Sequence, residues 1–104
     1  MNPWALLGLA GLLEIVWAIA LKQSHGFTRI GPTVVTVIGA FASFWLLAAA
    51  LKALPAGSAY AVWTGIGAIG VALVGILWLG ESASPLKLVG IALIVSGIAA
   101  LKMA

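Results

Sequence analysis

The sequence predicts an all-α integral membrane protein with four transmembrane helices. Hydrophobic residues make up 64% of the 104 residues and charged residues only 7%, whereas a soluble domain carries about 25% charged residues. So few polar groups cannot cover the surface of a soluble fold, and a disordered chain needs the opposite composition. The chain has no cysteine for a disulfide or thiolate site, and its net charge of +3 comes from scattered basic residues. A soluble domain, a disordered chain and a nucleic-acid-binding protein are therefore excluded.

The first two helices are predicted over residues 3–21 and 31–51. The first run is apolar apart from Glu14, and the polar, turn-forming segment Lys22–Gly26 ends it. Gly31 and Pro32 open the second run, which continues to Leu51 without a charged residue. Each run reaches the length of about 17–25 mostly apolar residues that a spanning helix needs.

The third and fourth helices are predicted over residues 57–79 and 84–102. The third run has no charge, whereas the fourth is shorter. We interpret the fourth as a span because Ser84 can cap a helix that Pro85 opens, and because Lys87 and Lys102 can reach the headgroups at its two ends. Since all loops are short, neighbouring helices should run antiparallel and residues 1–104 should form a single four-helix transmembrane domain.

The basic residues are divided almost equally between the two sides of the membrane. Four spans place Lys52 and Lys102 on one side and Lys22, Arg29 and Lys87 on the other. Because the difference in lysine and arginine between the sides sets orientation, this count favours insertion in both orientations. A fixed orientation set by one residue of bias remains the alternative.

Glu14 is the one acidic residue inside a predicted span. It lies about 3 Å from the centre of its helix, where a charged side chain is costly unless it is protonated, paired or hydrated. A carboxylate that holds either a proton or a cation, but not both, is sufficient for proton-coupled antiport. The alternative is a protonated glutamate that makes one interhelical hydrogen bond.

The neighbours of Glu14 on its helix face are small or aromatic. Gly11, together with two alanines, either leaves room for a ligand or allows another helix to approach. Trp17 offers an aromatic face beside the carboxylate, and that pair can recognise an organic cation.

Polar and aromatic side chains in the second and third spans are further candidates. Tyr60, Trp63, Thr64 and Gly67 share one helix face, and Glu14 is the charged partner available at that depth for the polar tips of Tyr60 and Trp63. Ser43 lies in the middle of the second span. A serine there usually bonds its own i−4 carbonyl, so the sequence alone favours that interpretation over ligand binding.

Glycines indicate either movement or close packing. Gly65 and Gly67 can form a kink that acts as a hinge, or can allow close helix packing. Gly90 and Gly97 make a small-residue stripe, which predicts that the fourth helix is the oligomerisation helix. Because the chain shows no internal repeat, a second copy inserted upside down would supply the other half of a transport path.

Two segments carry a resemblance to a known family. Residues Glu14–Lys22, followed by His25–Arg29, resemble the first helix and loop of small multidrug resistance transporters, and Pro55–Ala68 resembles their third-helix signature. The length, the four spans and the single membrane glutamate agree over essentially the whole chain. Drug exporters of this family usually have a glycine three residues after the glutamate and Trp-Ser-Gly in the third helix. Trp17 and Thr64, with Lys52 and Lys102 at two helix ends, are instead similar to the guanidinium exporter branch.

The resemblance implies a function and a site. It implies an antiparallel, dual-topology homodimer in the bacterial inner membrane that exchanges external protons for cytoplasmic guanidinium. It implies that Glu14 binds both proton and substrate, and that Trp17, Ser43, Tyr60 and Trp63 surround it. No cofactor or metal is expected. Guanidinium fits such a site, because its paired N–H groups match a carboxylate bidentately.

Other functions remain open at this stage. The first alternative is export of quaternary ammonium or polyaromatic cations, against which Trp17 and Thr64 argue. A second alternative is a non-transporting subunit of a heteromeric pair, which the balanced charges disfavour. An enzyme is not expected, because the sequence has no nucleophile–base set and its single histidine, His25, falls in a loop.

Overall fold

The computed structural model describes residues 2–104, which form four helices joined by short loops. Within that range there is no strand. Each helix is long and apolar enough to cross a membrane, so the predicted all-helical architecture with four apolar helices is confirmed. The helices are α1 (Pro3–Gln23), α2 (Ile30–Leu51), α3 (Ala56–Trp78) and α4 (Pro85–Met103).

Polar caps and prolines set the starts of α1 and α4. The Asn2 side chain accepts a hydrogen bond from the Trp4 backbone N–H at 2.8 Å, and Pro3 opens α1. The Ser84 hydroxyl accepts from the Lys87 backbone N–H at 3.2 Å, and Pro85 opens α4. Proline suits this position because the first N–H groups of a helix have no partner within it.

The loop between α1 and α2 is a tight turn built around Ser24. Its fully buried hydroxyl donates to the Leu21 carbonyl at 2.7 Å and accepts from the Phe27 backbone N–H at 3.1 Å. His25, Gly26 and Phe27 all have positive φ, at 48°, 70° and 68°. Residues other than glycine rarely adopt a positive φ. The hydrogen bonds of Ser24 therefore stabilise a backbone that reverses direction within a few residues.

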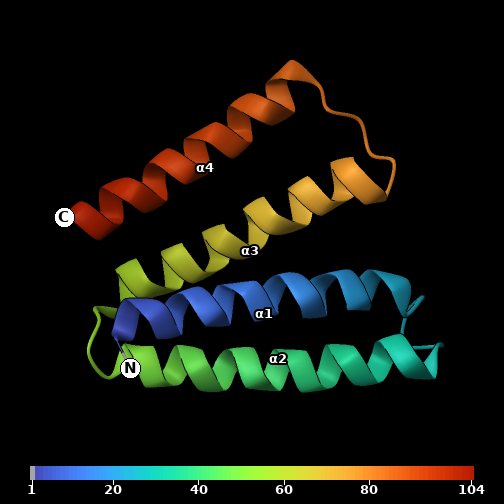
Figure 1. The fold of residues 1–104 in the computed structure, drawn as a ribbon, viewed down its shortest axis with the longest axis horizontal. Helices are drawn as coiled ribbons and strands as arrows, with labels where there is room; N and C mark the ends of the chain where they lie inside the picture. The colour runs from blue at the N-terminus through green and yellow to red at the C-terminus, as the bar shows by residue number, and fades with distance from the viewer. Residues whose placement is uncertain (1) are drawn as a thin grey trace.

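The helices are arranged around α1. Figure 1 shows α1 between α2 and α3, with α4 following α3 and diverging from the rest of the bundle. The buried core lies where the start of α1, the end of α2 and the start of α3 meet. Its members are Leu7, Ala10, Leu47, Ala50, Ala59, Val62 and Trp63.

The backbone of α4 lies close to that of α3 and of no other described helix, and none of its residues, 85–103, is buried. Contact with α3 is close at Gly65, where an added Cβ would lie 2.9 Å from Ile98. At its far end, the Lys102 ammonium lies 5.6 Å from the centroid of the Trp4 ring. A Cβ built on Gly90 or on Gly97 meets no atom within 4 Å, so the small-residue stripe of α4 faces open space.

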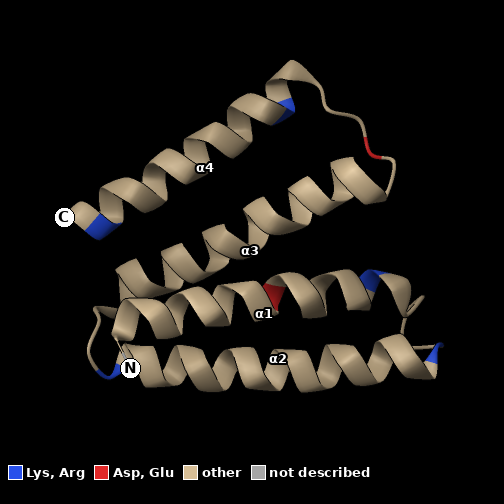
Figure 2. Cartoon of the chain, in the orientation of Figure 1, with Lys and Arg blue, Asp and Glu red and all other residues tan. Residues whose placement is uncertain are grey.

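Charged residues other than Glu14 gather at the two ends of the bundle. Figure 2 shows lysines and arginine in blue at both ends, one red position in the middle of α1 and another red position in the loop between α3 and α4. Glu81, in the loop after α3, and Lys87, in the first turn of α4, form an ion pair at 3.1 Å. The apolar middle of the bundle and its charged ends match the layers of a bilayer.

Candidate functional site

Glu14 lies in the middle of α1 and faces α3. Its Oε2 atom is buried and has no hydrogen-bond partner within residues 2–104. The nearest part of α3 is Gly67, where an added Cβ would overlap the Glu14 carboxylate. The lack of a side chain at this position therefore lets α3 approach the carboxylate closely. Gly67, which the sequence offered as a site or hinge residue, thus lies beside Glu14.

Ser43 joins three helices through one hydroxyl. This fully buried group on α2 donates to the Ala10 carbonyl of α1 at 2.6 Å and accepts from the Trp63 indole Nε1–H of α3 at 3.0 Å. The serine therefore does not bond its own i−4 carbonyl, as the sequence favoured, because the α1 carbonyl is within reach. The expectation that Trp63 donates to Glu14 is also wrong, since Ser43 takes its N–H.

A row of aromatic rings connects the predicted site residues. Ring centroids are 6.2 Å apart for Trp17 and Phe44, 5.7 Å for Phe44 and Trp63, and 5.4 Å for Tyr60 and Trp63. Sequence reasoning missed Phe44, which forms the middle of the row. Its signal was available, because Phe44 lies next to Ser43 in mid-span, one turn from Phe41.

Trp17 is held against α2 by Gly39. An added Cβ at Gly39 would lie 3.0 Å from the Trp17 Cβ, so this glycine sets how closely α1 and α2 approach at the level of the aromatic row. The indole Nε1 of Trp17 is buried without a hydrogen-bond partner in the described part of the chain. Gly39 was not predicted as a site residue, because its role depends on which turn of α1 it faces.

The other predicted residues lie at the edges of this arrangement. Tyr60 is 58% exposed and Thr64 is also exposed, so the face that they share with Trp63 and Gly67 is only half covered. Gly11 packs against Ile66, whose Cγ2 would lie 2.6 Å from an added Cβ. Gly65 faces α4, so Gly11 and Gly65 both lie at close contacts between helices. A hinge at Gly65 and Gly67 remains a prediction.

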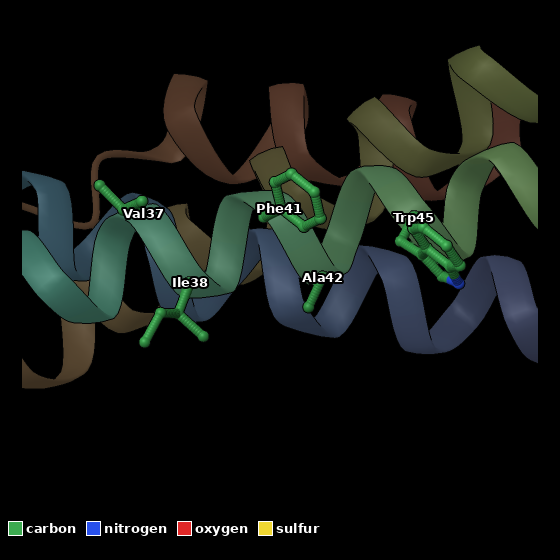
Figure 3. A pocket seen from close by; sticks show the side chains of 5 residues that line it. All are labelled: Val37, Ile38, Phe41, Ala42 and Trp45. Atoms are coloured by element: carbon green, nitrogen blue, oxygen red, sulfur yellow. The ribbon is translucent and has the colours of Figure 1, made fainter.

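Two of the hollows that border α2 differ in their position relative to the aromatic row. One, of about 390 Å³, runs between α1 and α2 beside Trp17 and Phe44. The other, of about 430 Å³, lies on the outer face of α2 around Ala42, between the side chains of Ile38, Phe41 and Trp45 (Figure 3). The second hollow contains no charged group, and no cluster of three or more potential metal ligands occurs in residues 2–104. Neither hollow is lined by an acidic side chain, and Glu14 is the one acid within the helices of residues 2–104.

Replacing Ser43 by alanine is expected to destabilise the helix bundle. The change leaves the buried Trp63 N–H without a partner, at about 1–3 kcal/mol, and removes the link from α2 to the Ala10 carbonyl, which keeps its own helical hydrogen bond. Thermal unfolding of the purified protein in detergent measures this loss. Ser96→Ala is the matched control, because the exposed Ser96 hydroxyl only donates to its own i−4 carbonyl at 2.8 Å. Equal stability of the two variants would contradict a joining role for Ser43.

Comparison with known proteins places this arrangement among transporters. Residues 2–94 match the family model described as Small Multidrug Resistance protein. The chain is 58% identical over 100 residues to a guanidinium exporter of Escherichia coli strain K12, covering 96% of this chain and 95% of the relative. It is 56% identical over 101 residues to a guanidinium exporter of Yersinia pseudotuberculosis, covering 97% of both chains. A guanidinium exporter of Citrobacter freundii is 56% identical over 100 residues, covering 96% of this chain and 95% of that relative.

Proposed function

Because the chain belongs to the small multidrug resistance family, we propose that it is a proton-coupled antiporter that exports guanidinium. The chain is a multi-pass protein of the bacterial inner membrane. Relatives that are 56% and 58% identical over nearly its whole length are named guanidinium exporters, which supports both the substrate and a transporter rather than an enzyme. The finer steps of the proposal rest on the geometry around Glu14.

The observation that carries the proposal is the unpartnered carboxylate oxygen of Glu14. Buried polar atoms almost always have a hydrogen-bond partner, and an acidic group within a membrane is costly to keep. In this chain Glu14 Oε2 has neither a donor nor a cation beside it within residues 2–104. A carboxylate left open in this way is available to a proton or to the paired N–H groups of a guanidinium ion.

Antiport follows from competition for this one group. A protonated Glu14 has lost the charge that attracts a cation, and a Glu14 paired with guanidinium has no oxygen free for a proton. Proton binding from outside therefore releases substrate, and substrate binding from inside releases the proton. Trp17, Phe44 and Trp63 border the path with aromatic faces that attract cations, while Ser43 holds the three helices at this level in register.

We propose that two copies, inserted in opposite orientations, form the working transporter. Helix α4 contributes no buried residue within one protomer, and its Gly90 and Gly97 face open space, which supports α4 as the dimerisation helix. The near-equal distribution of basic residues between the ends (Figure 2) supports insertion in both orientations. The exposed Tyr60 would then be covered by the second copy, and exchange of the two protomer conformations would give alternating access.

Transport by the wild-type protein in liposomes tests the proposal. Guanidinium should enter the liposomes against its own gradient when an outward proton gradient is imposed. This uptake should stop when a proton ionophore removes the proton gradient. Movement of a quaternary ammonium ion without movement of guanidinium would assign the chain to multidrug export. If neither cation moves, the chain is a subunit that needs a second chain, and co-expression with such a chain would be tested.

A second candidate substrate class is favoured by the hollow beside Trp17. Its lining of Leu21, Val37, Ala40 and Phe41 is apolar, and it opens next to the aromatic row. A cation with one apolar arm could place that arm there while its charge stays at Glu14. The same liposome assay with alkyl-substituted cations separates this class from guanidinium itself.

Replacing Trp17 by glycine is expected to weaken the preference for guanidinium over larger cations by at least about tenfold. The indole fills the space between Gly39 and Phe44, and its removal leaves room for a bulkier cation. Competition by larger cations in the liposome assay measures the change. Trp45→Gly is the control, since Trp45 is 69% exposed on the outer face of α2. An unchanged preference in Trp17→Gly would show that steric exclusion by this ring does not set selectivity.

A further inference from the structure

A groove lies away from the aromatic row, where α1, α2 and α3 meet near the α1–α2 loop. It has a volume of about 430 Å³. Ile15, Ile19 and Gln23 of α1 line it, together with Pro32 and Val35 of α2 and Val74 of α3. None of the residues assigned above to the substrate site lines this groove. Its walls are apolar along most of its length, and Gln23 marks a polar outer end.

The groove spans the depth of one membrane leaflet. Its inner end is at Ile15, the residue after the mid-span Glu14, and its outer end is at Gln23, the last residue of α1. Eight residues of helix cover about 12 Å, which is close to half of the roughly 30 Å hydrocarbon core. An acyl chain that starts at the headgroup region would therefore reach the inner end of the groove.

Two basic residues lie close along the chain to residues that line the groove near its outer end. Lys22 lies one turn beyond Ile19, on the same side of α1, and Arg29 caps α2 three residues before Pro32. Both side chains belong to exposed residues. The ion pair recorded within residues 2–104 joins Glu81 and Lys87, so neither Lys22 nor Arg29 has an acidic partner there. Long basic side chains at this depth extend to the phosphates of the membrane surface.

We propose that this groove binds an anionic phospholipid, with one acyl chain in the groove and the phosphate between Lys22 and Arg29. The charges favour this occupant over a second protein copy. A protein helix seated in the groove would partly desolvate two cations without neutralising them, whereas an anionic headgroup supplies the missing charge. The hollow shown in Figure 3 lacks these features, because α2 alone lines it and no basic side chain borders it.

Native mass spectrometry of the purified protein tests the role of the charges. Phosphatidylglycerol and phosphatidylcholine with identical acyl chains are the two probes. We expect wild-type protein to retain phosphatidylglycerol more strongly, and the double variant Lys22→Gln/Arg29→Gln to bind it about thirty-fold more weakly, or about five-fold for each charge. The control Lys52→Gln/Lys102→Gln removes the same charge from the other end and should bind as the wild type does. Equal binding of the two lipids by wild type, or equal loss in both double variants, would overturn the proposal.

A matched pair of valine variants tests the groove itself. Val35 lines the groove and is 45% exposed, whereas its neighbour Val34 is 48% exposed and does not line it. Val35→Trp should fill the groove and remove phosphatidylglycerol binding, while Val34→Trp should leave it unchanged. Guanidinium binding by both variants shows that they are folded. If Val35→Trp retains the lipid, or if it instead separates dimers into protomers, the groove is not a lipid site.

Discussion

Replacing Glu14 by glutamine is expected to abolish proton-coupled guanidinium transport. Glutamine keeps the size of the side chain and its place against Gly67, but it can neither take up the coupled proton nor carry the charge that pairs with guanidinium. Removing one partner of an ion pair in a poorly solvated site costs about 3–5 kcal/mol, so substrate binding should fall by at least about a hundredfold. Equilibrium binding of guanidinium and uptake into liposomes measure the two losses separately.

Glu81→Gln is the matched control for this experiment. Glu81 is the other acidic residue of the chain, and its carboxylate forms an exposed ion pair with Lys87. Such pairs contribute about 0–1 kcal/mol, so this variant should transport guanidinium nearly as well as the wild type. If Glu14→Gln retained proton-coupled transport, the proposed mechanism would be contradicted, because no other acid lies within the helices of the described chain.

Replacing Gly67 by alanine is expected to displace the Glu14 carboxylate and to impair substrate binding without removing any charge. The added methyl group would overlap the carboxylate. Either the glutamate rotates away or α1 and α3 separate, and overpacking of this kind costs about 1–3 kcal/mol. Guanidinium affinity should therefore fall by about fivefold or more. Isothermal titration calorimetry with purified protein measures this change.

Two other glycines of α3 separate this effect from a general loss of packing. Gly70 faces the Ile15 side chain, so Gly70→Ala overpacks the same helix pair away from the carboxylate. Gly57 lies on the same helix with no atom within 4 Å of an added Cβ, so Gly57→Ala should change little. We expect Gly70→Ala to lower stability but to bind guanidinium with nearly normal affinity. If Gly67→Ala and Gly70→Ala lose affinity equally, Gly67 has no specific role beside Glu14.

Much of the fold could be predicted because membrane insertion leaves strong signals in one dimension. Apolar runs of sufficient length must become helices, since the bilayer offers no other partner for their backbone groups. The start of α4 was also readable, because Ser84 and Pro85 act within the first turn. The end of α1 lies two residues beyond the predicted Leu21. There the backbone N–H of Ser24 still bonds the Ala20 carbonyl, so polar residues in the turn did not mark the last helical residue.

The site was only partly predictable, because its contacts depend on how the helices are aligned. Glu14 could be identified from the sequence because a charged side chain within a membrane span is energetically costly, whichever residues surround it. The partner of Trp63 could not be found in this way, because both Glu14 and Ser43 lie at mid-span and only the register of α1 against α2 decides between them. Gly39 shows the same limit. A glycine opposite Trp17 matters and a glycine facing open space does not, although both look alike in the sequence.

The lone position of α4 has a consequence for gene dosage. In the proposed homodimer, the burial that α4 lacks within its own chain is gained only when two chains meet in the membrane. By mass action, the amount of assembled transporter at low copy number rises with the square of the amount of chain made. A cell that doubles expression from a weak promoter would then gain about four times the export capacity, so modest changes in transcription would act as a steep control on tolerance of the exported cation.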